Sequence, residues 1–178
     1  MIENLRRKRR DIRWMNECLP LAERLAAADG VEEGGAEYLV LAALALDEGS
    51  AARAFTAVDL EPTDFAAAVE AAHADALASI GVTARPPTHA AGSTPRSSHQ
   101  RGPLRSGPTS HRLFRATIDE VRAADQPLSG AAVLAAACRA ALDPANHSTT
   151  SRALRRLDVD LVSLESAARI EAAAVGTD

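Results

Sequence analysis

Two stretches of the chain, 36–46 and 131–141, are apolar on nearly every face. Helices of that kind belong at the centre of a bundle, because a surface helix needs a polar face. Other segments repeat apolar residues with the helical period, which predicts amphipathic helices around the two central ones. Pro20 and Pro62 open two of these segments, at the helix position that proline favours. The further helices are expected at 20–28, 50–57, 62–79, from 111 onward, at 150–157 and at 161–174.

The composition agrees with a helical chain. The 178 residues include 40 alanines, whereas aromatic residues make up only 3%. Alanine is the strongest helix former, and the residues that favour strands are scarce. We therefore predict an all-α fold and exclude most β-rich architectures. A membrane span is not expected, because no uninterrupted apolar run reaches about 18 residues.

Two segments depart from the helical pattern. Residues 81–108 are rich in Pro, Gly, Ser and Thr and contain no acid. Such a segment buries too little apolar surface to offset its ordering entropy, so we predict a flexible linker. Residues 1–13 form a basic arm that carries Arg6, Arg7, Lys8, Arg9 and Arg10. The net charge of −4 nevertheless argues against a dedicated nucleic-acid binder.

The same helix order occurs on both sides of the linker. The matched pairs are AERLAAAD (22–29) with IDEVRAAD (118–125), GAEYL (35–39) with GAAVL (130–134), and RAFTAVDLEP (53–62) with RALRRLDVDL (152–161). Three matches in one order indicate an internal duplication. We predict two tandem pseudo-repeated four-helix units, at 14–80 and 109–174. One such unit is too small for a robust core, so the two should pack together as one domain.

This repeated pattern resembles the Clp repeat, the unit of the N-terminal domains of Clp-type AAA+ unfoldases such as ClpC and ClpA. The likeness is carried by the motif Gly-Ala-Glu-Tyr-Leu-Val-Leu-Ala-Ala-Leu from Gly35, by the segment Ala-Ala-Arg-Ala-Phe, and by Val-Asp-Leu before the next helix. It covers about residues 14–80 and 109–174. The chain contains no Walker-type phosphate loop, so we expect a stand-alone member without the ATPase modules.

The resemblance implies a recognition module that performs no chemistry. In the family the domain docks adaptors and substrates, in some members phosphoarginine-marked proteins, and in actinobacterial members cyclic-peptide antibiotics. Glu37 falls on the motif glutamate that pairs with the guanidinium in phosphoarginine-binding members, and a carboxylate suits that role. We take Glu37 and the adjacent Tyr38 as candidate ligand-binding residues, with Ala132 as the counterpart of Glu37. The structural alternative is a first-turn glutamate that stabilises a helix N-terminus.

We therefore predict a non-enzymatic protein- or peptide-binding module that modulates Clp-dependent proteolysis as an adaptor, a competitor or a ligand-sequestering decoy. Its expected partners are Clp protease components or their substrates and adaptors, including phosphoarginine-marked proteins or cyclic peptides. No membrane, metal or cofactor is expected, and nucleic acid is an unlikely partner. The alternative is a small helical DNA-binding or transcription-related protein that uses the basic arm, which otherwise forms a solvated helix start.

The remaining candidate residues are assigned to structure. Cys18 and Cys138 cannot form a disulfide framework, so we expect buried thiols in a cytoplasmic protein without a secretory signal. The five histidines show no metal-ligand spacing and are expected in solvent. Four aromatic residues are expected in the core: Trp14, Phe55, Phe65 and Phe114.

Overall fold

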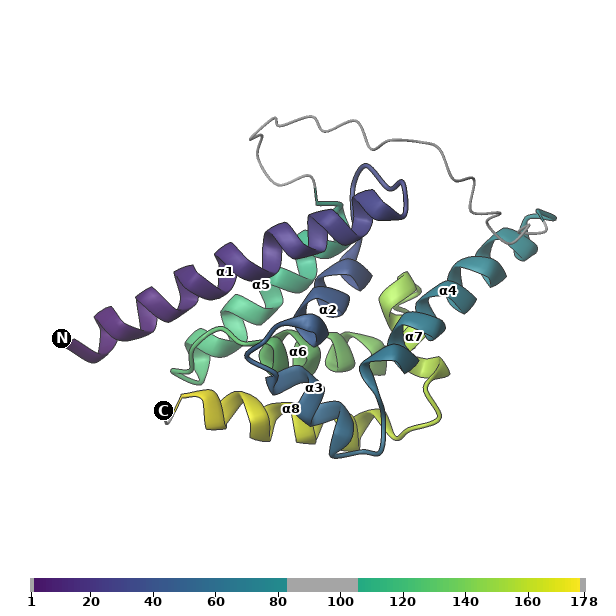
Figure 1. Ribbon diagram of the computed structural model, residues 1–178. Coiled ribbons are helices and arrows are strands. Elements are labelled where there is room, and N and C mark those ends of the chain that lie inside the picture. Colours follow the sequence, from purple (N-terminus) through teal and green to yellow (C-terminus); the bar gives the residue numbers. More distant parts are fainter. Residues whose placement is uncertain (1, 83–105, 177–178) are drawn as a thin grey trace.

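The computed structural model describes residues 2–82 and 106–176, with side chains from Leu5 onward, and eight helices occur within these ranges. The helices are α1 (Ile2–Ala28), α2 (Ala36–Ala45), α3 (Ser50–Thr56), α4 (Pro62–Ser79), α5 (Pro108–Ala123), α6 (Gly130–Leu142), α7 (Thr149–Arg156) and α8 (Leu161–Val175). The all-α prediction is confirmed (Figure 1). Most of the predicted linker, residues 83–105, lies outside the described residues.

The two central helices are α2 and α6, as their apolar sequences predict. Leu39 and Val40 of α2 and Val133 and Leu134 of α6 are almost completely buried. These two helices contact each other, and α5 and α7 each pack against both of them. Alanine fills much of the remaining contact surface, which lets the helix backbones approach closely.

The first helix is longer than its sequence predicts. A helix start at Pro20 is wrong, because α1 runs from Ile2 to Ala28 with Pro20 inside it. An interior proline costs a helix about 3 kcal/mol. A buried stripe with four-residue spacing passes through this region and packs towards α2, which offsets that cost. The stripe consists of Trp14, Cys18, Ala22 and Ala26.

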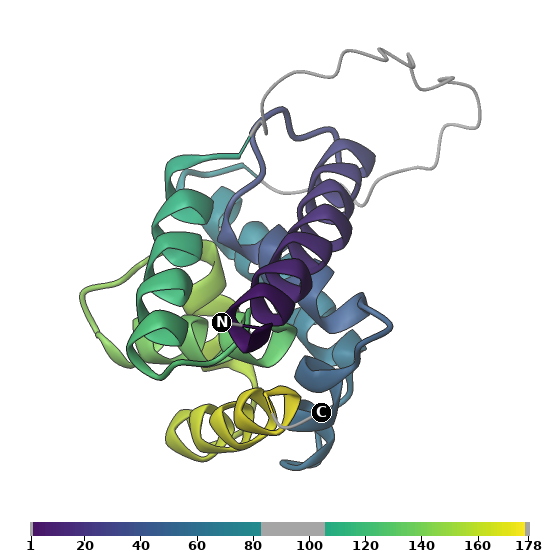
Figure 2. The ribbon, with the colours of Figure 1, turned by 90° about the vertical axis from the view of Figure 1, so that its left-hand side faces the viewer.

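The predicted basic arm is the N-terminal half of α1, and it is attached to the opposite half of the chain. Arg7 forms an ion pair with Asp125, beyond the end of α5. The Nη1 of Arg10 donates to the carbonyl oxygen of Val175 at 3.0 Å, near the end of α8. Asp11 accepts a hydrogen bond from the backbone N–H of Leu128 at 2.8 Å. The two ends of the chain consequently lie at the same end of the molecule (Figures 1 and 2).

The first four helices and the last four pack in a reciprocal way. Helix α3 contacts α8, while α4 contacts α7. An ion pair lies in each of these contacts. Arg53 of α3 lies 2.7 Å from Glu171 of α8, and Arg156 of α7 pairs with Asp75 of α4. The two halves therefore share one core rather than forming separate bodies.

A capping network at the centre also joins the halves. The Glu48 carboxylate accepts hydrogen bonds from the backbone N–H of Gly130, at the start of α6, and from the hydroxyl of Ser50 at 2.9 Å. The Ser50 hydroxyl in turn accepts from the N–H of Ala131 at 2.9 Å. These side chains satisfy donors that the first turn of α6 leaves without a partner inside the helix.

The aromatic residues follow their prediction with one exception. Trp14 is 5% exposed, and Phe55 and Phe65 are fully buried with their rings edge to face at a centroid distance of 6.5 Å. Edge-to-face contact is a favoured arrangement of aromatic rings. Phe114 is only partly buried, at the margin of the core. Its predicted place inside the core is therefore wrong, because α5 presents Leu113 and Thr117 to the interior instead.

Candidate functional site

The start of α2 lies at the junction of the two halves. Gly107 donates its backbone N–H to the carbonyl oxygen of Gly34 at 2.8 Å, and Ala36 donates its N–H to the Thr109 hydroxyl at 3.2 Å. These two bonds hold the N-termini of α2 and α5 side by side. Glu37, the second residue of α2, belongs to this junction.

Glu37 is 8% exposed, which is a low value for a carboxylate. Its Oε2 accepts a long hydrogen bond of 3.5 Å from the Thr150 hydroxyl of α7. The carboxylate also folds back over Gly35, where an added Cβ would lie 2.5 Å from either oxygen. Negative charge next to the first turn of α2 is favourable. Glu37 therefore combines a buried position with few direct partners.

A cavity of about 220 Å³ lies next to the start of α2, between α2, α5, α6 and α7. Its wall has an apolar part made of alanines and Leu113 and a polar part made of hydroxyl, amide and guanidinium groups. Glu37 does not line the cavity but lies behind Thr150, which does. The polar lining residues are Thr109, Arg112, Asn146, Ser148, Thr150 and Ser151.

Tyr38 belongs to a different environment from Glu37. It is 2% exposed, and its hydroxyl donates to the Asp29 carboxylate at 3.0 Å, near the end of α1. Burial raises the pKa of Tyr38, and the neighbouring Asp29 raises it further. The structure therefore does not bring Tyr38 and the Glu37 carboxylate together at one surface.

The five basic residues of the predicted patch divide into two groups. Arg7 and Arg10 are engaged with Asp125 and the Val175 carbonyl, as described above. Arg6, Lys8 and Arg9 are exposed on α1. The continuous basic surface that the sequence predicts is thus reduced to three exposed cations.

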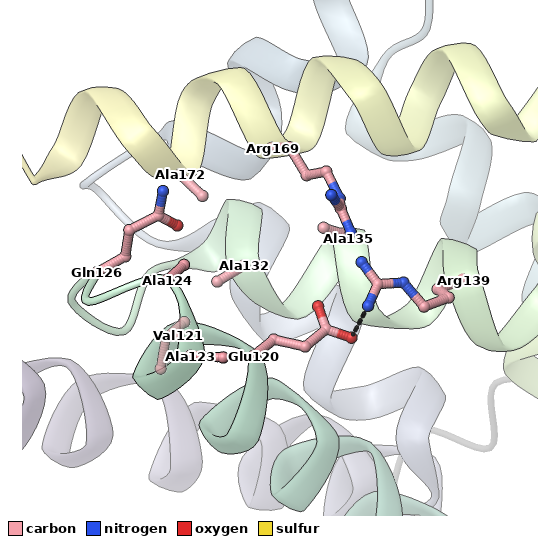
Figure 3. A pocket seen from close by; sticks show the side chains of 10 residues that line it. All are labelled: Glu120, Val121, Ala123, Ala124, Gln126, Ala132, Ala135, Arg139, Arg169 and Ala172. Atoms are coloured by element: carbon pink, nitrogen blue, oxygen red, sulfur yellow. Dashed lines mark ion pairs between the residues drawn. The ribbon is translucent and has the colours of Figure 1, made fainter.

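A second cavity, of about 380 Å³, lies between α5, α6 and α8. An ionic network borders it (Figure 3). The Arg139 guanidinium of α6 lies 2.8 Å from Glu120 of α5 and 3.0 Å from Glu165 of α8, and Glu165 also meets Arg169 at 3.0 Å. Partial burial raises the pKa of Glu120, Arg139 lowers it, and Glu165 raises it.

Sequence reasoning missed this network. One local signal is the four-residue spacing of Glu165 and Arg169, which places them on one face of α8. Arg139, the cation inside the apolar sequence of α6, is a second signal. Ala132, the counterpart of Glu37, lines this second cavity.

The thiols are placed as predicted. Cys18 and Cys138 are both fully buried, and burial raises each pKa to about 12, so neither is an activated nucleophile. His111 and His147 are exposed and His73 is partly buried, whereas His89 and His99 lie outside the described residues. Within the described ranges, no group of three or more His, Cys, Asp or Glu side chains is arranged to hold a metal ion. No helix there is long and apolar enough to cross a bilayer.

Comparisons with known proteins identify no relative of this chain. No protein-family model matches the chain, and no curated protein or solved structure matches it either. The likeness to Clp N-terminal domains therefore rests on the motif residues and the helix order.

Proposed function

We propose that this chain is a non-catalytic protein- and peptide-binding module related to the N-terminal domains of Clp-type unfoldases. In this role it modulates Clp-dependent proteolysis as an adaptor, a competitor or a decoy that sequesters a ligand. The observation that carries the proposal is the buried Glu37 carboxylate behind the 220 Å³ cavity at the junction of the two halves. The motif that supplies the resemblance thus begins at a cavity with a mixed polar and apolar wall.

The chemistry of this cavity suits an arginine-like group that carries a phosphoryl. The hydroxyls of Thr109 and Ser151 and the Arg112 guanidinium offer donors for phosphoryl oxygens. Glu37 offers acceptor oxygens for a guanidinium, and such pairs are strong when bidentate. The Glu37 Oε2 already lies 3.5 Å from the Thr150 hydroxyl, which lines the cavity, so rotation of the side chain away from Gly35 would bring the carboxylate to the ligand. The first turn of α2 has no other acid to take its place.

The reciprocal packing supports the tandem-repeat part of the proposal. Helices α3 and α4, third and fourth in the first half, contact α8 and α7, fourth and third in the second half. The helix entries match as well, since Gly35 precedes α2 and Gly130 opens α6, while Glu61 and Asp160 are the N-caps of α4 and α8. A duplicated unit packed about a pseudo-twofold axis accounts for this pattern.

The ligand part is tested by titrating the protein with a peptide that contains phosphoarginine. We expect saturable binding to the wild type, and a loss of about tenfold or more in E37Q, because that substitution removes a charge-assisted pair. E61Q is the matched control, since Glu61 is an exposed acid at the start of α4, away from the cavity. Equal affinities of wild type and E37Q would remove Glu37 from the site.

The Clp part needs a separate experiment, in which the tagged protein captures partners from its native cell extract. The proposal predicts that Clp protease components, or their substrates and adaptors, are retained. A capture that contains no Clp component, together with no binding of phosphoarginine or cyclic peptides, would contradict the proposed function.

One observation favours the nucleic-acid alternative: Arg6, Lys8 and Arg9 are exposed on α1. If they bind phosphates, DNA retention should fall steeply with salt and disappear when all three are changed to glutamine. Arg7 and Arg10 should be left unchanged in that variant, because they hold α1 to the second half of the chain. No retention at low salt would eliminate this function.

A further inference from the structure

The cavity between α5, α6 and α8 has walls of short side chains. Ala132 and Ala135 from α6, Ala172 from α8 and Val121 from α5 line it, and its volume is about 380 Å³. Helices α6 and α8 are in extensive contact, so the space remains because the residues that face it are small. The volume lies within the range of ligand pockets, about 300–1,000 Å³.

Charged groups border one end of this cavity. Figure 3 shows the guanidinium groups of Arg139 and Arg169 close to each other, with the Glu120 carboxylate beside Arg139. Arg139 uses donors on both sides, towards Glu120 and Glu165. The Nε of Arg169 lies 3.0 Å from Glu165, and the Arg169 side chain is 58% exposed. This exposed guanidinium presents its Nη groups to solvent, in the planar fork geometry that matches a carboxylate.

The opposite end of the cavity carries an amide. Figure 3 shows the Gln126 side chain near Ala172, away from the two guanidinium groups. An amide both donates and accepts hydrogen bonds, which suits a peptide group. The cavity thus offers, in order, a carboxylate-binding fork, an apolar wall and a peptide-binding amide.

We propose that this cavity binds the C-terminal end of a peptide, with the terminal carboxylate on Arg169 and a small or medium apolar last side chain against Ala132, Ala135 and Ala172. The Gln126 amide then bonds a peptide group one or two residues earlier. This site is separate from the Glu37 cavity and does not depend on the function proposed for it. The pair of acids, Glu120 and Glu165, keeps the guanidinium groups oriented and limits the site to one negative group.

The test compares three ligands by calorimetric titration and by backbone amide NMR of the full chain. The first is a hexapeptide that ends in Ala-Leu with a free carboxylate, the second is the same peptide with an amidated C-terminus, and the third is isovalerate. We expect the acid peptide to bind and to shift the amides of Ala132, Ala135 and Ala172. The amidated peptide should bind about tenfold more weakly or worse, because it lacks the charge-assisted pair.

Two variants and a control complete the experiment. R169A should weaken the acid peptide about as much as amidation does, because it removes the same pair. A172L should abolish binding by filling the cavity while Arg169 is kept, provided that its circular dichroism spectrum matches the wild type. If A172L does not fold, R169K replaces it, since lysine keeps the charge but loses the bidentate fork. R156A is the control, because Arg156 is an exposed, ion-paired arginine of α7 that does not line the cavity.

Two results would overturn the proposal. Equal affinities of the acid and amidated peptides would show that the terminal carboxylate is not recognised. If isovalerate binds as tightly as the acid peptide, the peptide groups contribute nothing to binding, and the ligand is a small carboxylic acid instead.

Discussion

The substitution G130A places a methyl group where α6 begins and where no side chain fits. A Cβ at Gly130 would lie 2.8 Å from the carbonyl oxygen of Ala43 and 2.8 Å from the Glu48 carboxylate, with Ala51 at 3.2 Å. The Ala43 oxygen belongs to the backbone of a closely packed helix, so it moves aside only if α2 and α6 separate locally. The Glu48 carboxylate would have to move and would lose its bond to the Gly130 N–H.

The expected cost is worked from three terms. Overpacking of this kind costs about 1–3 kcal/mol. Disturbing the Glu48 hydrogen bond adds about 1 kcal/mol. Alanine recovers up to about 1 kcal/mol through its higher helix propensity. G130A should therefore lower the free energy of unfolding by about 2 kcal/mol, which corresponds to a fall in Tm of roughly 4–8 °C for a chain of this size.

Urea unfolding followed by circular dichroism measures this difference, and G35A is the matched control. Gly35 precedes α2 as Gly130 opens α6, but the three atoms nearest to an added Cβ there all belong to the end of the flexible Glu37 side chain. We expect G35A to change the free energy of unfolding by less than about 1 kcal/mol. An unchanged free energy of unfolding in G130A, or a larger loss in G35A than in G130A, would contradict this explanation.

Three further predictions concern single groups. Cys18 and Cys138 should resist an aromatic disulfide reagent in the native protein and react promptly in urea, because burial raises both pKa values to about 12; labelling of the native protein would contradict this. Burial also raises the pKa of Glu120 above its usual 4.5. The contribution of Glu120 to stability is therefore lost as the pH rises from 4.5 through that higher pKa. Urea titrations should show the free energy of unfolding of the wild type falling relative to that of E120Q over this window, and a constant difference would contradict this. S129A should lower the free energy of unfolding by about 1 kcal/mol, since Ser129 caps α6 by accepting from the N–H of Ala132; an unchanged Tm would count against it.

The apolar pattern was sufficient to predict the central helices. The sequences of α2 and α6 leave no polar face for solvent, so burial on all sides was the one consistent outcome. The start of α4 at Pro62 and that of α8 after Asp160 were also predictable, because proline and the N-cap act through neighbouring residues. These signals depend on neighbouring residues only, so the predicted helix starts agree with those in the structure.

The first half of α1 was not predictable in the same way. Its consecutive cations repel one another along the helix, and Pro20 suggests a boundary. The helix continues because contacts with distant parts of the chain hold it, at Asp125, Leu128 and Val175. Likewise, Glu48 caps Gly130 from 82 positions away in the sequence. Neither role leaves a local pattern.

The two cavities could not be predicted from the sequence for a similar reason. The first is bordered by four helices and the second by three, and the volume of each depends on how closely alanine-rich faces approach. The motif identified Glu37 as a candidate, but it did not show that the side chain folds over Gly35 or that Tyr38 is bonded to Asp29. Such details depend on packing between elements far apart in the chain.

The most direct measurement of the central claim is a calorimetric titration of wild type and E37Q with one peptide in two forms, carrying either phosphoarginine or arginine. We expect saturable binding of the phosphoarginine form by the wild type, weaker binding of the arginine form, and at least a tenfold loss for both in E37Q. No binding of either form, or unchanged affinities in a folded E37Q, would contradict it.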